Sequence, residues 1–95
     1  MIYATLLKPE TIKLLWTPQK TNEGKEIEYG LGWQVKKGKI GKEMRYIVSH
    51  AGGAEGCTSQ LFILPEDEIV IVVVANMYST KGMFQLCQKI ATLYK

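Results

Sequence analysis

The only histidine of this 95-residue chain, His50, lies directly before two glycines, in the sequence His50-Ala51-Gly52-Gly53. A histidine can bind a substrate or transfer protons near neutral pH, and a strand glycine lets another backbone approach closely because it has no Cβ. A structural interpretation is also open. A histidine at a strand end can bond a neighbouring carbonyl, and paired glycines can form a tight turn or a bulge.

Three runs rich in β-branched and aromatic residues position this histidine, at 46–53, 57–65 and 69–76. Their close spacing, with turn residues between them, predicts three consecutive antiparallel strands, and His50 lies at the end of the first. The third run is apolar at every position from Ile69 to Val74. Because such a run is typical of a strand covered on both faces, we expect a central strand and not an edge strand.

The region before these strands predicts a short helix and one further strand. Residues 8–16 carry Pro9 in the first turn and place Ile12, Leu15 and Trp16 on one helical face. Residues 29–35 alternate large apolar residues with glycine or polar ones, which predicts a strand with one packed face and a closely approaching neighbour at its glycines. Residues 19–28 and 36–44 are expected to be solvated connections.

A final helix is predicted after Asn76, with Ser79 or Thr80 as its N-cap. Its apolar residues occupy half of the helical wheel, so it should cover one face of the sheet; they are Met83, Phe84, Leu86, Cys87, Ile90, Ala91, Leu93 and Tyr94. The short helix near the start covers little of the other face. We therefore expect a partner chain or another part of the polypeptide to complete the fold.

Composition narrows the class of protein. A net charge of +3, with basic residues spread through a glycine-containing segment, is too weak for a typical nucleic-acid binder. Cys57 and Cys87 have no metal-ligand spacing, so we expect reduced thiols and neither a metal nor a cofactor. Cys57 could form a nucleophile pair with His50, although a small buried thiol is the commoner outcome. No apolar run approaches the ~20 residues that a membrane span needs.

Several short motifs together resemble the C-terminal portion of the serine beta-lactamase-like and penicillin-binding-protein family, in its class C-like branch. They are Tyr29-Gly30-Leu31-Gly32-Trp33, His50-Ala51-Gly52-Gly53, Gly56, Ser59, Leu64-Pro65-Glu66 and Val74-Ala75-Asn76, with Leu7 to Thr11 and Trp16-Thr17-Pro18 nearer the start. The last two bring the chain near the mitochondrial members from animals. The resemblance implies a mitochondrial location, which the sequence itself leaves open.

The resemblance implies a serine hydrolase acting on amide, ester or beta-lactam carbonyls. The family's site combines a Ser-x-x-Lys nucleophile, a Tyr-x-Asn or Ser-x-Asn motif, and a Lys-Thr-Gly or His-x-Gly strand. His50-Ala51-Gly52 resembles this third motif. By that resemblance His50 holds substrate or relays protons, the Gly53 N–H is one of two oxyanion donors, and Ala51 and Gly52 lie along the substrate backbone.

The first two motifs are absent from the sequence. Thr5 to Lys8 has the spacing of the nucleophile motif but begins with threonine, and no Tyr-x-Asn or Ser-x-Asn occurs. We therefore expect one α+β domain over 1–95, with three to four antiparallel strands and the C-terminal amphipathic helix on one face, as an incomplete piece of the family fold. Alone it should be inactive, and its partner is the missing N-terminal portion or a second copy. The alternative is a non-catalytic module that self-associates or binds a partner.

Overall fold

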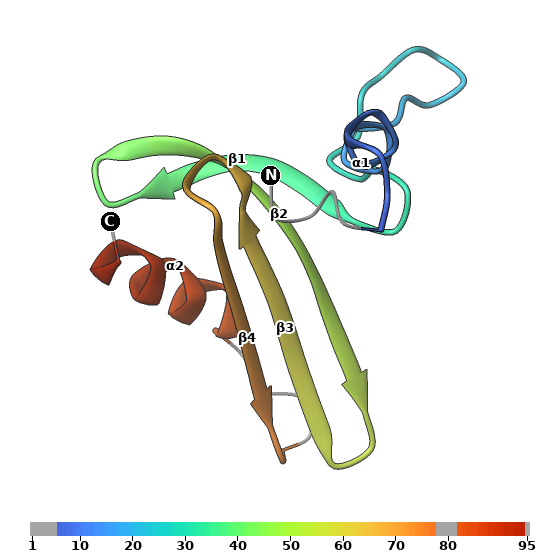
Figure 1. The fold of residues 1–95 in the computed structure, drawn as a ribbon. Coiled ribbons are helices and arrows are strands. Elements are labelled where there is room, and N and C mark those ends of the chain that lie inside the picture. Colours follow the sequence, from blue (N-terminus) through green and yellow to red (C-terminus); the bar gives the residue numbers. More distant parts are fainter. Residues whose placement is uncertain (1–5, 78–81, 95) are drawn as a thin grey trace.

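A computed structural model describes residues 6–77 and 82–94 of the chain (Figure 1). In it, four strands form one antiparallel sheet in the order β1-β2-β3-β4, so each strand after β1 pairs with the one that precedes it. The elements are α1 (Pro9–Leu15), β1 (Gln34–Ile40), β2 (Glu43–Ala54), β3 (Cys57–Leu64), the 3₁₀ turn η2 (Pro65–Asp67), β4 (Ile69–Ala75) and α2 (Met83–Leu93). This confirms the predicted α+β class, and the sheet has four strands, the larger of the two numbers predicted.

The first helix begins and ends within one residue of its predicted bounds. Pro9 opens α1 after Lys8 in extended conformation, because proline needs no N–H partner in the first turn. Ile12 is buried, and Leu15 and Trp16 are half-buried, so the predicted apolar face is confirmed. Trp16 meets Trp33 edge to face, with ring centroids 6.4 Å apart.

The strand predicted at 29–35 is placed wrongly. Tyr29 forms only an isolated bridge with Gln34, and residues 31–33 are bends. Strand β1 instead runs through the lysine-rich segment that was expected to be a solvated connection. Only Gly41 and Lys42 separate it from β2. Val35 and Ile40 are buried on opposite faces, while the lysines keep this edge strand polar, a common protection against unwanted pairing. Lys36 extends over the Phe84 ring, 4.2 Å from its centroid.

The core lies between the sheet and α2. On this α2 face, Ile47 of β2 and Leu64 of β3 belong to one buried cluster, and Leu64 stands opposite Ile69 of β4. Below them pack Cys87 and Ala91 of α2, both fully buried. The buried cluster comprises Ile40, Ile47, Phe62, Leu64, Cys87 and Ala91. The predicted final helix is thus confirmed as the cover of one face.

The opposite face of the sheet is only partly covered, and β4 is not the central strand that its sequence predicts. Among the described residues β4 pairs on one side alone, so it is an edge strand of this sheet. Val70, Val72 and Val74 point away from α2 and are 45%, 62% and 69% exposed. The uninterrupted apolar run is therefore half solvated here. We call these three valines the open valine face.

The C-terminal helix also leaves part of its apolar arc in solvent. Cys87 and Ala91 face the sheet, whereas Leu86, Leu93 and Tyr94 are exposed. Ser79 and Thr80, the predicted N-cap residues, lie outside the described residues. Within the described part of the chain, no helix is long and apolar enough to cross a membrane.

Candidate functional site

The second half of β2 has an open outer edge. The pairing of β1 with β2 ends where Gln34 meets Ser49, while β2 continues to Ala54 against β3. From His50 to Ala54, the side of β2 that faces away from β3 has no strand partner among the described residues. All of these residues are solvent-exposed. An extended segment of another molecule can pair with such an edge through main-chain hydrogen bonds.

His50 lies at the first position of this open edge, on the face opposite α2. Its Nδ1 is 2.7 Å from the carbonyl oxygen of Ala51, and its Nε2 is 3.2 Å from the hydroxyl of Tyr29. The two rings meet edge to face, with centroids 6.2 Å apart. Both ring nitrogens therefore have partners, which fixes the imidazole plane. The carbonyl contact predicted by the structural interpretation of His50 is present.

Sequence reasoning missed Tyr29. The sequence pattern placed it in a strand, whereas the structure places it in a turn that returns beside β2. Its carbonyl accepts the Gln19 N–H at 2.8 Å, and the N–H of the next residue, Gly30, donates to Trp33 at 2.7 Å. The signal that could have found it is the glycine that follows Tyr29, because a glycine inside a strand pattern often marks a bend or a close backbone approach.

The glycines of the motif have different surroundings. Gly52 stands opposite Ser59 on the face that carries His50, and a Cβ on Gly52 would lie 2.8 Å from the Ser59 hydroxyl oxygen. Gly53 and Ala51 belong to the other face, because side chains alternate along a strand. A Cβ on Gly53 would meet no atom within 4 Å. The four residues predicted for the site thus share the open edge, with His50 and Gly52 on one face.

Neither Ser49 nor Cys57 reaches His50. Ser49 faces α2, the opposite side of the sheet. Cys57 stands opposite Ala54, four residues beyond His50, which is about 13 Å along a strand. It is exposed, whereas Cys87 is buried. The suggested Cys–His pair is therefore excluded by distance. Among the described residues, no three His, Cys, Asp or Glu side chains are arranged so that they could hold a metal ion.

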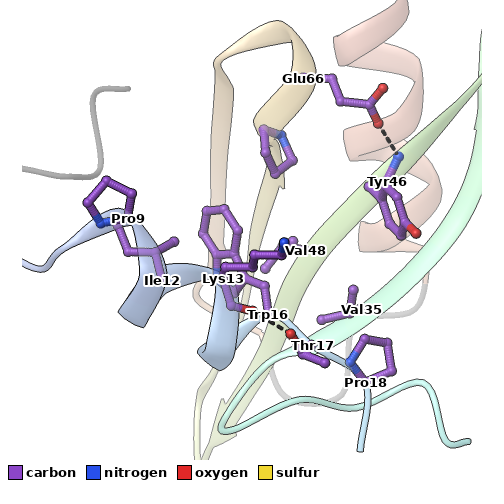
Figure 2. A pocket seen from close by; sticks show the side chains of 11 residues that line it. Pro9, Ile12, Lys13, Trp16, Thr17, Pro18, Val35, Tyr46, Val48 and Glu66 are labelled. Carbon is purple, nitrogen blue, oxygen red and sulfur yellow. Dashed lines mark hydrogen bonds between the residues drawn. The ribbon is translucent and has the colours of Figure 1, made fainter.

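An apolar pocket of about 580 Å³ lies on the same face, between α1 and the sheet (Figure 2). Its floor includes Val48, which precedes His50 by one pleat, roughly 7 Å along β2. Glu66 accepts the Tyr46 N–H at 2.9 Å beside the pocket, so η2 is held against β2 there. The lining residues are Pro9, Ile12, Lys13, Trp16, Thr17, Pro18, Val35, Tyr46, Val48, Pro65 and Glu66.

Comparisons with known proteins identify relatives of this chain. It is 36% identical over 105 residues to the serine beta-lactamase-like protein LACTB, mitochondrial, of Bos taurus, and 35% and 34% identical to the proteins of that name from Mus musculus and Homo sapiens. Each match covers 90% of this chain and 19% of the relative.

The chain therefore spans about a fifth of the length of the curated relatives it matches. No protein-family model and no solved structure matches it. The resemblance read from the short motifs is confirmed by these whole-segment matches. Over nine-tenths of its own length, the chain is therefore similar to a segment of these serine beta-lactamase-like proteins.

Proposed function

We propose that this chain supplies the His-x-Gly strand of a serine beta-lactamase-like hydrolase that acts on amide, ester or beta-lactam carbonyls. In this proposal His50 holds the substrate or moves a proton at the reacting group. The N–H of Gly53 is one oxyanion donor, and Ala51 and Gly52 lie along the substrate backbone. A mitochondrial location, which the relatives' names state for those proteins, is part of the same proposal.

The observation that carries the proposal is the open edge of β2 beginning at His50. A carbonyl substrate that lies beside a strand edge can use main-chain groups for alignment. Donors held rigidly by the sheet need little reorganisation when negative charge develops on the carbonyl oxygen. The pairing of 50–54 with β3 supplies that rigidity from one side and leaves the other side accessible.

The apolar pocket suggests what part of a substrate this chain accommodates. Val48 connects it with His50 on one face of β2, and Trp16 and Val35 contribute further apolar wall. Ligand sites are commonly apolar concavities with a few polar groups at one side. We propose that the pocket receives an apolar group of the substrate while the carbonyl lies beside His50.

Catalysis in this proposal needs a nucleophile from elsewhere. The sequence contains no Ser-x-x-Lys motif, and Ser49 lies on the wrong face of the sheet. Loss of the nucleophilic serine costs a serine hydrolase on the order of a millionfold in turnover. The chain by itself is thus proposed to be inactive, and a segment carrying the nucleophile must lie over the face that bears His50.

A chimera tests this function. The segment of the bovine relative that aligns with this chain is replaced by residues 1–95, and the product is assayed with peptide, ester and beta-lactam substrates beside the unmodified bovine protein. We expect the chimera to be active and to react with a covalent serine-hydrolase probe. His50→Ala should lower kcat/KM about 100-fold or more, the usual contribution of a proton-transferring group.

The matched control is Cys57→Ala, which changes an exposed side chain on the same face as His50. It should leave the activity of the chimera unchanged. Probe labelling of the isolated 95-residue chain would contradict the absence of a nucleophile. A folded, active chimera that tolerates His50→Ala would remove His50 from the site.

A second candidate function is a non-catalytic module that self-associates, and the open valine face favours it. A seven-residue edge strand without charge or proline is poorly protected against pairing with another strand. In this case the isolated chain should form a stable dimer or larger oligomer in sedimentation experiments. Val72→Lys should dissociate it, Leu93→Lys on α2 should not, and His50→Ala should have no effect. A monomeric wild-type chain would eliminate this candidate.

A further inference from the structure

We propose that Tyr29 is a positioning residue that holds neutral His50 as its Nδ1–H tautomer and makes Nε2 the proton-accepting atom of the site. The inference rests on the proposed function for its catalytic meaning. The tautomer itself is a property of this chain alone. It follows from two contacts on opposite sides of one ring, at Ala51 and at Tyr29.

The contact with Ala51 fixes the position of the proton. A backbone carbonyl oxygen can only accept a hydrogen bond, so at 2.7 Å from it Nδ1 must carry hydrogen. A neutral imidazole has one N–H, and Nε2 is then an acceptor. The hydroxyl of Tyr29, 3.2 Å from Nε2, must be the donor of the second bond. An unconstrained histidine side chain favours the opposite, Nε2–H form, so these partners act against the default.

Tyr29 is suited to this role because its backbone is held in place from three directions. Its carbonyl accepts the Gln19 N–H, and Tyr29 forms an isolated bridge with Gln34 at the start of β1. The following residue, Gly30, is buried under the carbonyl of Leu15. The residue as a whole is 37% exposed, and its hydroxyl reaches Nε2 of His50 from the solvent side of the turn.

In this arrangement, protonation of His50 reverses the hydrogen bond that His50 shares with the hydroxyl of Tyr29. When Nε2 takes a proton, both ring nitrogens become donors. The hydroxyl of Tyr29 then accepts from Nε2, and its own hydrogen must turn away from the ring toward another acceptor. Tyr29 thereby presents a donor toward a molecule at the open edge only when His50 is charged. Proton transfer and substrate contact are coupled through one hydroxyl group.

The single histidine makes the test direct. Nitrogen chemical shifts of the His50 ring, measured by long-range ¹H–¹⁵N correlation on the full chain at alkaline pH, report the neutral tautomer without overlap. We expect a majority of Nδ1–H in the wild type. Tyr29→Phe removes the hydroxyl and keeps the ring, and should shift the tautomer ratio roughly fivefold toward Nε2–H, as expected for loss of an ordinary hydrogen bond.

The matched control is Tyr46→Phe, which removes a hydroxyl four residues from His50 on the same face and should leave the ratio unchanged. A majority of Nε2–H in the wild type would overturn the proposal, and so would an unchanged ratio in Tyr29→Phe. Because the measurement needs no activity, it separates this inference from the proposed function. An inactive chimera with the expected tautomer would reject only the function, and an active chimera with the opposite tautomer only the role of Tyr29.

Discussion

Gly30 lies so close to the end of α1 that a Cβ built on it would be 2.2 Å from the carbonyl oxygen of Leu15. The same oxygen accepts the N–H of Leu31 at 2.9 Å, so it cannot move away without losing that bond. This contact joins α1 to the turn that carries Tyr29. The glycine therefore serves the site indirectly, because it allows the helix end and the tyrosine turn to meet.

Gly30→Ala should accordingly be among the most damaging small substitutions in this chain. We expect it to lower the free energy of unfolding by about 3 kcal/mol, the upper part of the usual range for overpacking, because the obstructing atom belongs to the backbone. Urea denaturation followed by circular dichroism measures this. Gly53→Ala, which adds the same methyl group in open space, is the control. Equal stability of the two variants would contradict the contact.

Gly52→Ala should have a smaller cost that a second change relieves. Its new methyl group meets the hydroxyl oxygen of Ser59, which belongs to a rotatable side chain, so we expect a loss of about 1 kcal/mol. Ser59→Ala in the same chain should restore most of it. A double-mutant cycle by urea denaturation measures the coupling, and strictly additive effects would show that the two residues do not touch.

Ser49→Ala should make the protein more stable. The Ser49 hydroxyl is buried on the α2 face and finds no hydrogen-bond partner among the described residues. A buried polar group without a partner costs about 1 to 3 kcal/mol, so removing it should raise the free energy of unfolding by about 1 kcal/mol. Ser59→Ala, at a half-exposed position, should change it by less than about 0.5 kcal/mol. Destabilisation by Ser49→Ala would reveal a partner for the hydroxyl.

The two cysteines should differ in their reaction with iodoacetamide. Burial raises the pKa of the Cys87 thiol, and the thiolate is the reactive form, so at pH 8 exposed Cys57 should be alkylated while Cys87 stays protected until the chain unfolds. Mass spectrometry of Cys57→Ala isolates the second thiol. Rapid alkylation of Cys87 in that variant, under native conditions, would mean that α2 does not cover it.

The raised pKa of Cys87 also makes the free energy of unfolding depend on pH in a defined direction. The native state binds this proton more tightly than the unfolded chain does, so its contribution is complete below the thiol pKa of the unfolded chain and is lost as pH rises toward the native value. The free energy of unfolding should therefore fall as pH rises from the thiol pKa of the unfolded chain to that of the native state. Cys87→Ala should remove this part of the pH dependence, and Cys57→Ala should retain it.

Local sequence patterns predicted the helices and strands more accurately than they predicted which of these elements lie next to one another. Pro9 and the apolar period identified both helices, and turn residues separated β2, β3 and β4 correctly. The lysines of β1 concealed a strand, because a solvated edge strand and a loop have similar composition. The valines of β4 caused the opposite error, because they predicted a covered central strand where the sheet has an exposed edge strand. An apolar run records what a strand can bury, whereas coverage depends on which other segments are present.

The site was predictable only in part for the same reason. His50 and the two glycines are contiguous, so their placement on one strand follows from the sequence. The open edge beside them depends on where β1 stops pairing, at Gln34 and Ser49, which no local pattern records. The contact of Tyr29 with His50 crosses 21 residues and depends on the turn at Gly30. Long-range contacts of this kind require the fold.

The strictly sequential order of the sheet has a consequence for how the chain folds as it is synthesised. Each strand after β1 pairs with its immediate predecessor, so β2, β3 and β4 each find a partner already made when they leave the ribosome. The hairpins need only short loop closures, which favours rapid formation. The covering helix α2 comes last. Until α2 docks, Phe62 and Leu64 remain in water. During that time the uncovered sheet face can associate with other chains unless a chaperone binds it or α2 follows quickly.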